Sequence, residues 1–239
     1  MRPTSVALLL VAACAAPVAA PVAPPIPAGE DPLRWRADIE TFASQPTAAE
    51  APVVFVGSSS IRRWSTLARD MAPLPVLNRG FGGSRIFDSV YWLDRLVTCH
   101  HPAVVVVFAG TNDIQGDAPR SAAWVAARFE ELVSRLRALG CDAPLVYLAI
   151  SPSPSRERHL PIVLDANARI AALCARDPSL HFVDTASALL DERGCPDPRW
   201  FVADRLHLNP AGYAHWTKTL RPVVTDLYAK RNGGRAAGT

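Results

Sequence analysis

Two short blocks of the sequence carry the residue types that acyl transfer uses. A run of three serines, 58–60, follows Gly57, and Asp204 stands three residues before His207 near the other end of the chain. A serine hydroxyl attacks a carbonyl carbon when a histidine takes its proton, and a carboxylate beside the histidine holds the ring in the tautomer that faces the serine. These residues therefore predict a nucleophile, a base and an orienting acid.

Two further blocks carry groups that stabilise a negatively charged oxygen. Gly82-Gly83 lets a ligand approach the main chain closely, and Asn112, in the block 110–113, has a side-chain N–H donor. Each block also has an ordinary structural role, since serine runs commonly cap helices and paired glycines commonly form turns. The chemical interpretation rests on the four blocks together.

The stretches around these blocks alternate between two hydrophobic patterns. Short apolar runs predict five strands, at 52–57, 75–78, 103–110, 145–150 and 181–184. Helical periodicity predicts helices at 84–98, 121–139, 164–174 and 211–228. Such alternation gives a parallel sheet with helices on both faces, whose active residues lie at the carboxyl ends of the strands. The serine, glycine and asparagine blocks follow three of these strands, so we expect them to meet.

In order and spacing, the four blocks resemble the SGNH (GDSL) hydrolases, a family of esterases, lipases and carbohydrate deacetylases. The stretch FVGSSSIRRW, residues 55–64, is similar to a bacterial subgroup of the platelet-activating-factor acetylhydrolase branch. The resemblance covers about residues 50–225 and implies a flavodoxin-like three-layer α/β sandwich with a five-stranded parallel sheet. Ser59 matches the nucleophile, two residues after Gly57, while Ser58 and Ser60 replace the aspartate and leucine of the family pattern.

The resemblance implies a role for each of the other blocks. His207 matches the general base and Asp204 its orienting carboxylate. The oxyanion hole would be formed by the backbone N–H groups of Ser59 and Gly83 and by the side chain of Asn112. The family pattern requires no cofactor.

The substrate is predicted less directly than the reaction. The sequence has no long insertion to form a lid, so we expect a shallow site that takes short acyl groups. By analogy with the family, O-acetyl esters on carbohydrate or cell-envelope polymers are the expected substrates, and short-chain lipid esters are the close rival. The alternative is a non-catalytic carbohydrate-binding or scaffold relative with the same fold.

Composition and motifs argue against several other functions. Lys and Arg number 25 against 22 Asp and Glu, and the basic residues are scattered, so no nucleic-acid partner is expected. The sequence contains no HExxH or other metal-ligand spacing and no P-loop, and the glycine block fails the dinucleotide pattern GxGxxG at Arg85. The expected partner is a small-molecule or carbohydrate ester.

The N-terminus has the pattern of an export signal. One arginine precedes an apolar run from Val6 to Ala16, which is too short for a membrane span and is followed by small residues. We expect residues 1–20 to be a signal peptide and the protein to be exported to the periplasm or the extracellular medium. A lipoprotein signal that ends before Cys14, with a lipid anchor on that residue, is the alternative. Residues 21–31 are predicted as a Pro/Ala-rich linker, 32–231 as the hydrolase domain and 232–239 as a flexible tail.

Four cysteines remain beyond the signal segment: Cys99, Cys141, Cys174 and Cys195. An even number in an exported chain permits disulfides, and Cys99 and Cys141 each precede a predicted strand, so that they could face each other. Four buried free thiols are the equal alternative. The absence of a CxxC motif excludes a zinc ribbon or redox pair of that type.

Overall fold

The computed structural model describes residues 22–45 and 50–236 and contains a five-stranded parallel sheet. Its strands are β1 (Val53–Gly57), β2 (Val76–Gly80), β3 (Val104–Phe108), β4 (Leu145–Leu148) and β5 (Leu180–Val183), in the order β2-β1-β3-β4-β5. This is the flavodoxin-like order, in which the chain reverses its direction across the sheet between β1 and β3. The predicted fold class is confirmed, and the five strands agree with the prediction to within two residues at each end.

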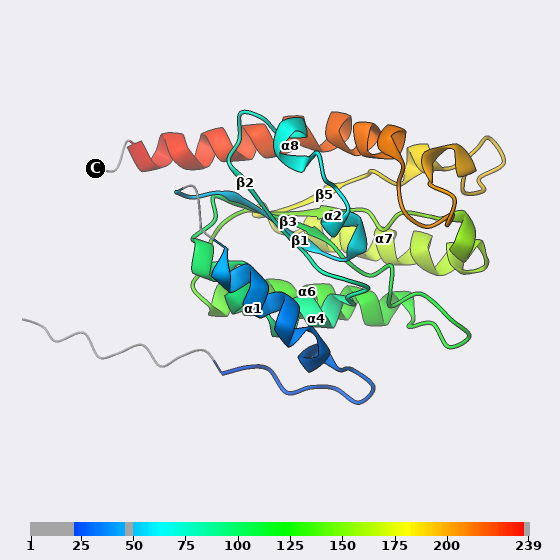
Figure 1. The fold of residues 1–239 in the computed structure, drawn as a ribbon, viewed down its shortest axis with the longest axis horizontal. Coiled ribbons are helices and arrows are strands. Elements are labelled where there is room, and N and C mark those ends of the chain that lie inside the picture. Colours follow the sequence, from blue (N-terminus) through cyan, green and yellow to red (C-terminus); the bar gives the residue numbers. More distant parts are fainter. Residues whose placement is uncertain (1–21, 46–49, 237–239) are drawn as a thin grey trace, which may run out of the picture.

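Helices cover both faces of the sheet (Figure 1). Along one face lie α1 (Arg36–Ser44), α4 (Ile86–Tyr91), α5 (Leu93–Leu96), α6 (Ala122–Ala138) and α7 (Leu160–Cys174). Along the other lie α2 (Ser59–Arg62), α3 (Leu67–Asp70) and the long α8 (Pro210–Ala236). All residues of β1 and β3 are buried, which is why these strands are apolar at every position rather than at alternate positions.

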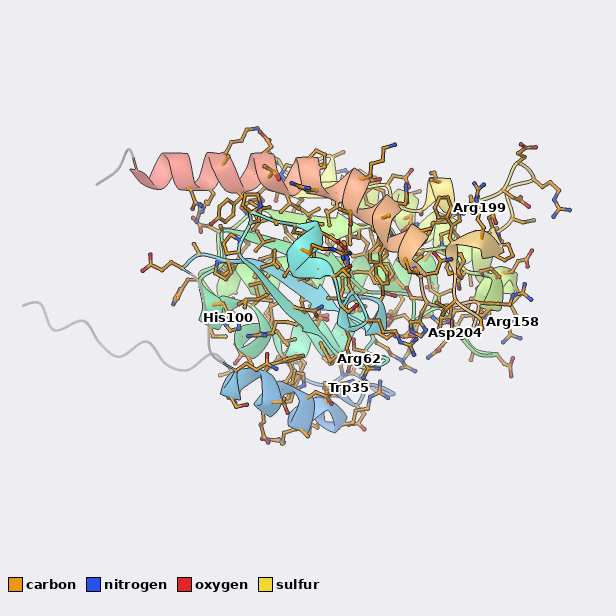
Figure 2. The ribbon with its side chains drawn as sticks, turned by 45° about the horizontal axis from the view of Figure 1, so that its top comes forward. Trp35, Arg62, His100, Arg158, Arg199 and Asp204 are labelled. Atoms are coloured by element: carbon orange, nitrogen blue, oxygen red, sulfur yellow. The ribbon has the colours of Figure 1, made fainter. Side chains whose placement is uncertain are left out.

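Short 3-10 helices occupy several of the connections. They are η1 (Pro32–Trp35), η2 (Thr98–His100), η3 (Pro154–His159), η4 (Ser187–Leu189) and η5 (Pro198–Trp200). The segment η3 follows the carboxyl end of β4 and lies at the same end of the molecule as the Asp204 loop, as Arg158 and Asp204 show in Figure 2.

The sequence predicts one continuous helix over residues 84–98, and this is wrong. The structure has two shorter helices there, α4 and α5, which are separated by Trp92. This residue has φ −97° and ψ 15°, outside the helical region, and its indole N–H donates to the carbonyl of Pro32 at 2.8 Å. A contact across 60 residues of sequence thus competes with local helix formation, and local periodicity does not reveal it.

Two other helices extend beyond their predicted bounds. Helix α7 starts four residues earlier than predicted, with Pro161 in its first turn, a position that proline tolerates well. Helix α8 runs to Ala236 and so includes part of the segment 232–239 that was predicted as a tail. The residues that extend α8 beyond its predicted end, 229–236, include two glycines but are otherwise mostly good helix formers.

The end of the predicted linker 21–31 is attached to the domain. The Glu30 side chain is buried, and one of its carboxylate oxygens lies 3.3 Å from the Arg85 guanidinium and 2.9 Å from that of Arg120. Residues 1–20, with Cys14, lie outside the described residues.

The structure also bears on cysteines, membrane spans and metals. Cys99, Cys141, Cys174 and Cys195 are all free thiols, but the alternative of four buried thiols is wrong in part, because Cys99 is exposed and Cys195 is only half-buried. Within the described ranges, no helix is long and apolar enough to cross a membrane. Nor does any group of three or more His, Cys, Asp or Glu side chains in that part of the chain have an arrangement that could hold a metal ion.

Candidate active site

The site begins where β1 ends, because Gly57 turns the chain sharply into α2. Gly57 has φ +148°, and a Cβ there would lie 2.0 Å from the backbone oxygen of Phe108 on the neighbouring strand β3. The next residue, Ser58, donates its N–H to that same oxygen at 3.2 Å. Ser59 is then the first residue of α2, at the carboxyl edge of the sheet and beside the point between β1 and β3 where ligands bind in such folds.

Ser59 and His207 meet at this edge. Ser59 Oγ lies 2.7 Å from His207 Nε2, and His207 Nδ1 lies 2.7 Å from Asp204 Oδ2. Since a carboxylate only accepts hydrogen bonds, the Nδ1 position carries the proton, which leaves the Nε2 lone pair free to accept the Ser59 hydroxyl proton. The structure therefore brings the three residues together in a continuous hydrogen-bonded chain.

The Asp204 carboxylate is held by its own loop. Its Oδ1 accepts the backbone N–H groups of Leu206 and His207, both at 2.9 Å, and Arg205, which follows Asp204 directly, adopts a left-handed conformation with φ +57°. Partial burial by itself disfavours the charged form of Asp204. The hydrogen bonds from the His207 backbone, the His207 ring and Leu206 outweigh that cost and lower the pKa of Asp204 to about 2. The Asp204 carboxylate is therefore an anion throughout the range of about pH 5 to 8 in which histidine side chains generally change charge.

The two remaining predicted site residues, Gly83 and Asn112, approach each other near the end of β1. The loop after β2 is tied to β1, since Phe81 N–H donates to Gly57 O at 3.0 Å and Ser84 Oγ to the same oxygen at 3.3 Å. Asn112 Nδ2 donates to Ser84 O at 2.9 Å. A Cβ added at Gly83 would have this Nδ2 as its nearest neighbour, at 3.9 Å. The Gly83 backbone and the Asn112 amide therefore border one space.

Trp35 supports the glycine loop from the N-terminal segment. Its ring packs edge-on against Phe81, and a Cβ at Gly82 would come within 2.2 Å of that ring. Gly82 also has φ +25°, a conformation that favours glycine. Trp35 Nε1 in turn donates to Asp88 Oδ2 at 3.0 Å, which fixes the indole. Sequence reasoning did not identify this support, because no local pattern connects residue 35 with the loop.

A buried carboxyl lies directly after the asparagine. Asp113 Oδ2 accepts the backbone N–H of Ile86 at 3.1 Å. Burial, reinforced by the charges of Glu30 and Asp88 and opposed by the hydrogen bond from Ile86 and the charge of Arg85, raises the pKa of Asp113 to about 8. Asp113 is thus predominantly protonated at neutral pH and ties the loop after β3 to the start of α4.

The protein thus combines a doubly wound parallel sheet with a hydrogen-bonded Ser–His–Asp chain at its switch point, an arrangement that can activate a serine hydroxyl as a nucleophile. The sequence matches the model of the GDSL-like lipase/acylhydrolase family over residues 47–215. The chain belongs to this family and is an ester hydrolase. No curated protein matches the sequence.

Solved structures with the same fold are distant in sequence. A Bacteroides fragilis protein provisionally described as an acylhydrolase superposes with a TM-score of 0.71 at 20% identity, over 83% of this chain and 99% of that one. A GDSL-like lipase from Bacteroides thetaiotaomicron gives 0.68 at 19% identity, over 82% and 98%. A family 3 carbohydrate esterase from Talaromyces cellulolyticus gives 0.60 at 15% identity, over 75% and 99%. At these identities the likeness establishes the fold.

Proposed function

We propose that the protein is a serine esterase that cleaves short-chain acyl esters, with O-acetyl esters as its main substrates. The observation that carries this proposal is the hydrogen-bonded chain from Ser59 Oγ through the His207 ring to Asp204, with 2.7 Å at each link. A chain of this kind activates a hydroxyl that is otherwise a weak nucleophile at neutral pH.

In the proposed mechanism, His207 Nε2 takes the hydroxyl proton as Ser59 Oγ attacks the ester carbonyl carbon. The tetrahedral oxyanion accepts hydrogen bonds from the backbone N–H groups of Ser59 and Gly83 and from Asn112 Nδ2. The C–O bond to the alcohol then breaks, and His207 gives the leaving oxygen its proton. Water, deprotonated by the same ring, releases the acyl group and restores Ser59.

The exposure of the site favours short acyl groups. The side chains of Asp204 and His207 are 41% and 12% exposed, so this pair lies near the protein surface. An acetyl group needs little apolar contact, whereas a long acyl chain gains its affinity by burying many methylene groups. The fold shared with a carbohydrate esterase is compatible with an acetylated sugar as the alcohol part of the ester.

We also propose that the protein is exported through the signal at residues 1–20. The basic start, the short apolar run and the small residues after it support this proposal. Expression of the full chain in a bacterial host, followed by fractionation and N-terminal sequencing, tests it. A mature chain that begins near residue 21 is expected, a lipid-modified Cys14 would indicate a lipoprotein, and an uncleaved cytoplasmic chain would contradict export.

The catalytic proposal is tested by hydrolysis of p-nitrophenyl acetate, butyrate and octanoate by the chain without its signal segment. The wild-type protein is expected to prefer acetate, and Ser59→Ala to lose activity with its circular dichroism unchanged. Ser60→Ala is the matched control, since it removes the neighbouring hydroxyl and is expected to retain activity. Equal rates in the wild type and Ser59→Ala would remove Ser59 as the nucleophile, and an inactive wild type would favour a non-catalytic binding protein.

A further inference from the structure

Arg156, which lies outside the predicted site, donates a hydrogen bond to Asn112, the side-chain candidate for the oxyanion hole. Arg156, in η3, donates from Nη2 to Asn112 Oδ1 at 3.0 Å and to Gln115 Oε1 at 2.9 Å, and from Nη1 to the backbone oxygen of Thr111. Its neighbour Ser155 donates its N–H to Arg205 O at 3.0 Å, in the loop between Asp204 and His207. The segment after β4 therefore contacts both halves of the site.

The Asn112 amide has only one orientation that fits these partners. A guanidinium offers donors only, so the oxygen of the amide has to face Arg156, while the carbonyl of Ser84 accepts only and has to face Nδ2. One N–H of Nδ2 donates to Ser84 O. The second N–H is left to donate to an oxygen atom in the space that Gly83 borders. A flipped amide would turn its oxygen toward that space and repel a negatively charged oxygen there.

The charge of Arg156 adds to this effect. All three of its acceptors are neutral oxygens, whereas the nearby Arg158 pairs with the carboxylate of Asp117 at 3.0 Å. Burial lowers the pKa of Arg156 to about 10, against the opposing charge of Asp113, so the guanidinium is a cation at neutral pH. A cation on Oδ1 polarises the amide and strengthens its N–H groups as donors.

We infer that Arg156 is a positioning residue for the proposed hydrolysis, which fixes the orientation of the Asn112 amide and strengthens its N–H as an oxyanion donor. This inference rests on the proposed function, because it takes Asn112 to donate a hydrogen bond to the oxyanion of the transition state. The other arginines labelled at this end of the molecule, Arg158 and Arg199 (Figure 2), bond instead to Gly116 O and to the Asp197 carboxylate.

The test is a double-mutant cycle of Arg156→Met and Asn112→Ala, with p-nitrophenyl acetate as substrate. Because the amide donor acts in the transition state, we expect Arg156→Met to lower kcat about 10- to 100-fold and to leave KM within about threefold. In the Asn112→Ala background the same substitution is expected to change kcat less than about threefold, since the group it acts through is gone. Arg156→Lys keeps the charge but not the planar guanidinium, and its kcat is expected to lie between those of the wild type and Arg156→Met. Arg158→Met is the matched control and is expected to retain wild-type kcat.

A spectroscopic measurement separates this inference from the catalytic proposal. In ¹⁵N-labelled protein, the side-chain amide signals of Asn112 are assigned by their loss in Asn112→Ala. Arg156→Met is expected to shift both signals, and Arg158→Met to leave them unchanged. If no variant and no wild-type preparation hydrolyses esters but the amide signals respond as expected, the catalytic proposal fails and the positioning contact stands. Equal losses of kcat in both backgrounds, or amide signals unaffected by Arg156→Met, would overturn the inference.

Discussion

Ser59 Oγ lies 2.7 Å from His207 Nε2, although 148 residues separate the two in the chain. Ser59 follows the first strand of the sheet, and His207 lies in the loop before the last helix. The contact forms because both segments lie at the same edge of the sheet. The third residue, Asp204, belongs to the His207 loop and depends on its local geometry.

The substitution Asp204→Asn is expected to abolish most of the activity while the fold remains intact. An asparagine amide at this position can donate to Nδ1, so the ring would carry its proton on Nε2 and could no longer accept the Ser59 proton. We expect kcat to fall roughly 10⁴-fold, as for the equivalent change in a serine protease. Steady-state kinetics checks this, with thermal melting as the control, and a loss of less than about tenfold would argue against the orienting role.

The rate is expected to rise with pH, because the proposed general base has to be neutral to accept the Ser59 proton. The pKa of Asp204 is lowered to about 2, so its carboxylate does not change charge in the range between about pH 5 and 8 where histidines titrate. A protonated imidazole cannot accept the Ser59 proton, and kcat/KM is therefore expected to increase toward neutral pH with a slope of about one on logarithmic axes. A rate that is constant over this range would contradict a histidine base.

Gly83→Ala is expected to reduce catalysis without weakening the fold. The nearest atom to an added Cβ is Asn112 Nδ2 at 3.9 Å, an ordinary contact, but the methyl group would enter the space that we propose for the oxyanion. We expect kcat to fall about tenfold or more and the free energy of unfolding to change by less than about 1 kcal/mol.

The neighbouring change Gly82→Ala is the matched control for this prediction. Its Cβ would meet the Trp35 ring at 2.2 Å in a backbone conformation that favours glycine, so it is expected to lower the melting temperature. If Gly83→Ala were the more destabilising of the two, the assignment of Gly83 to the site would lose its basis.

Asp113→Asn is expected to remove a pH dependence of stability. The pKa of Asp113 is raised from 3.8 to about 8 by burial, so between these values the folded protein holds a proton that the unfolded chain has released. The free energy of unfolding of the wild type therefore falls as pH rises across this window, by an amount on the order of a few kcal/mol. Asparagine keeps the acceptor for Ile86 N–H without the charge.

Urea unfolding at several pH values checks this prediction. The Asp113→Asn variant is expected to show a shallower decline of stability with pH than the wild type and to be the more stable of the two at pH 8. The exposed Asp117→Asn serves as control and is expected to follow the wild type. Parallel declines in all three proteins would show that Asp113 is ionised in the fold at neutral pH.

The sheet and the site residues were predictable because their signals are local. The run of valines in β3 requires burial on both faces, and Ser59, Gly83 and Asn112 each follow a strand whose carboxyl end has to lie at the common edge. The roles of these residues came from the family resemblance, which adds the Asp204–His207 spacing that strand positions alone do not explain.

The supports of the site were not predictable in this way. Trp35 reaches Gly82, and Arg156 reaches Asn112, through contacts between segments whose relative position only the folded chain determines. The break of the predicted helix 84–98 has the same origin, in the bond from Trp92 to Pro32. Arg156 lies in η3, several residues beyond the carboxyl end of β4, so its position along the chain does not point to Asn112.

Labelling of the active serine tests the central claim most directly. The protein is incubated with an alkyl fluorophosphonate, which reacts with an activated serine hydroxyl, and the modified residue is located by peptide mass spectrometry. A single adduct on Ser59 is expected, with none in Ser59→Ala and a much slower reaction in Asp204→Asn. Ester hydrolysis without any adduct on Ser59, or an adduct at another residue, would contradict the assignment of Ser59 as the nucleophile.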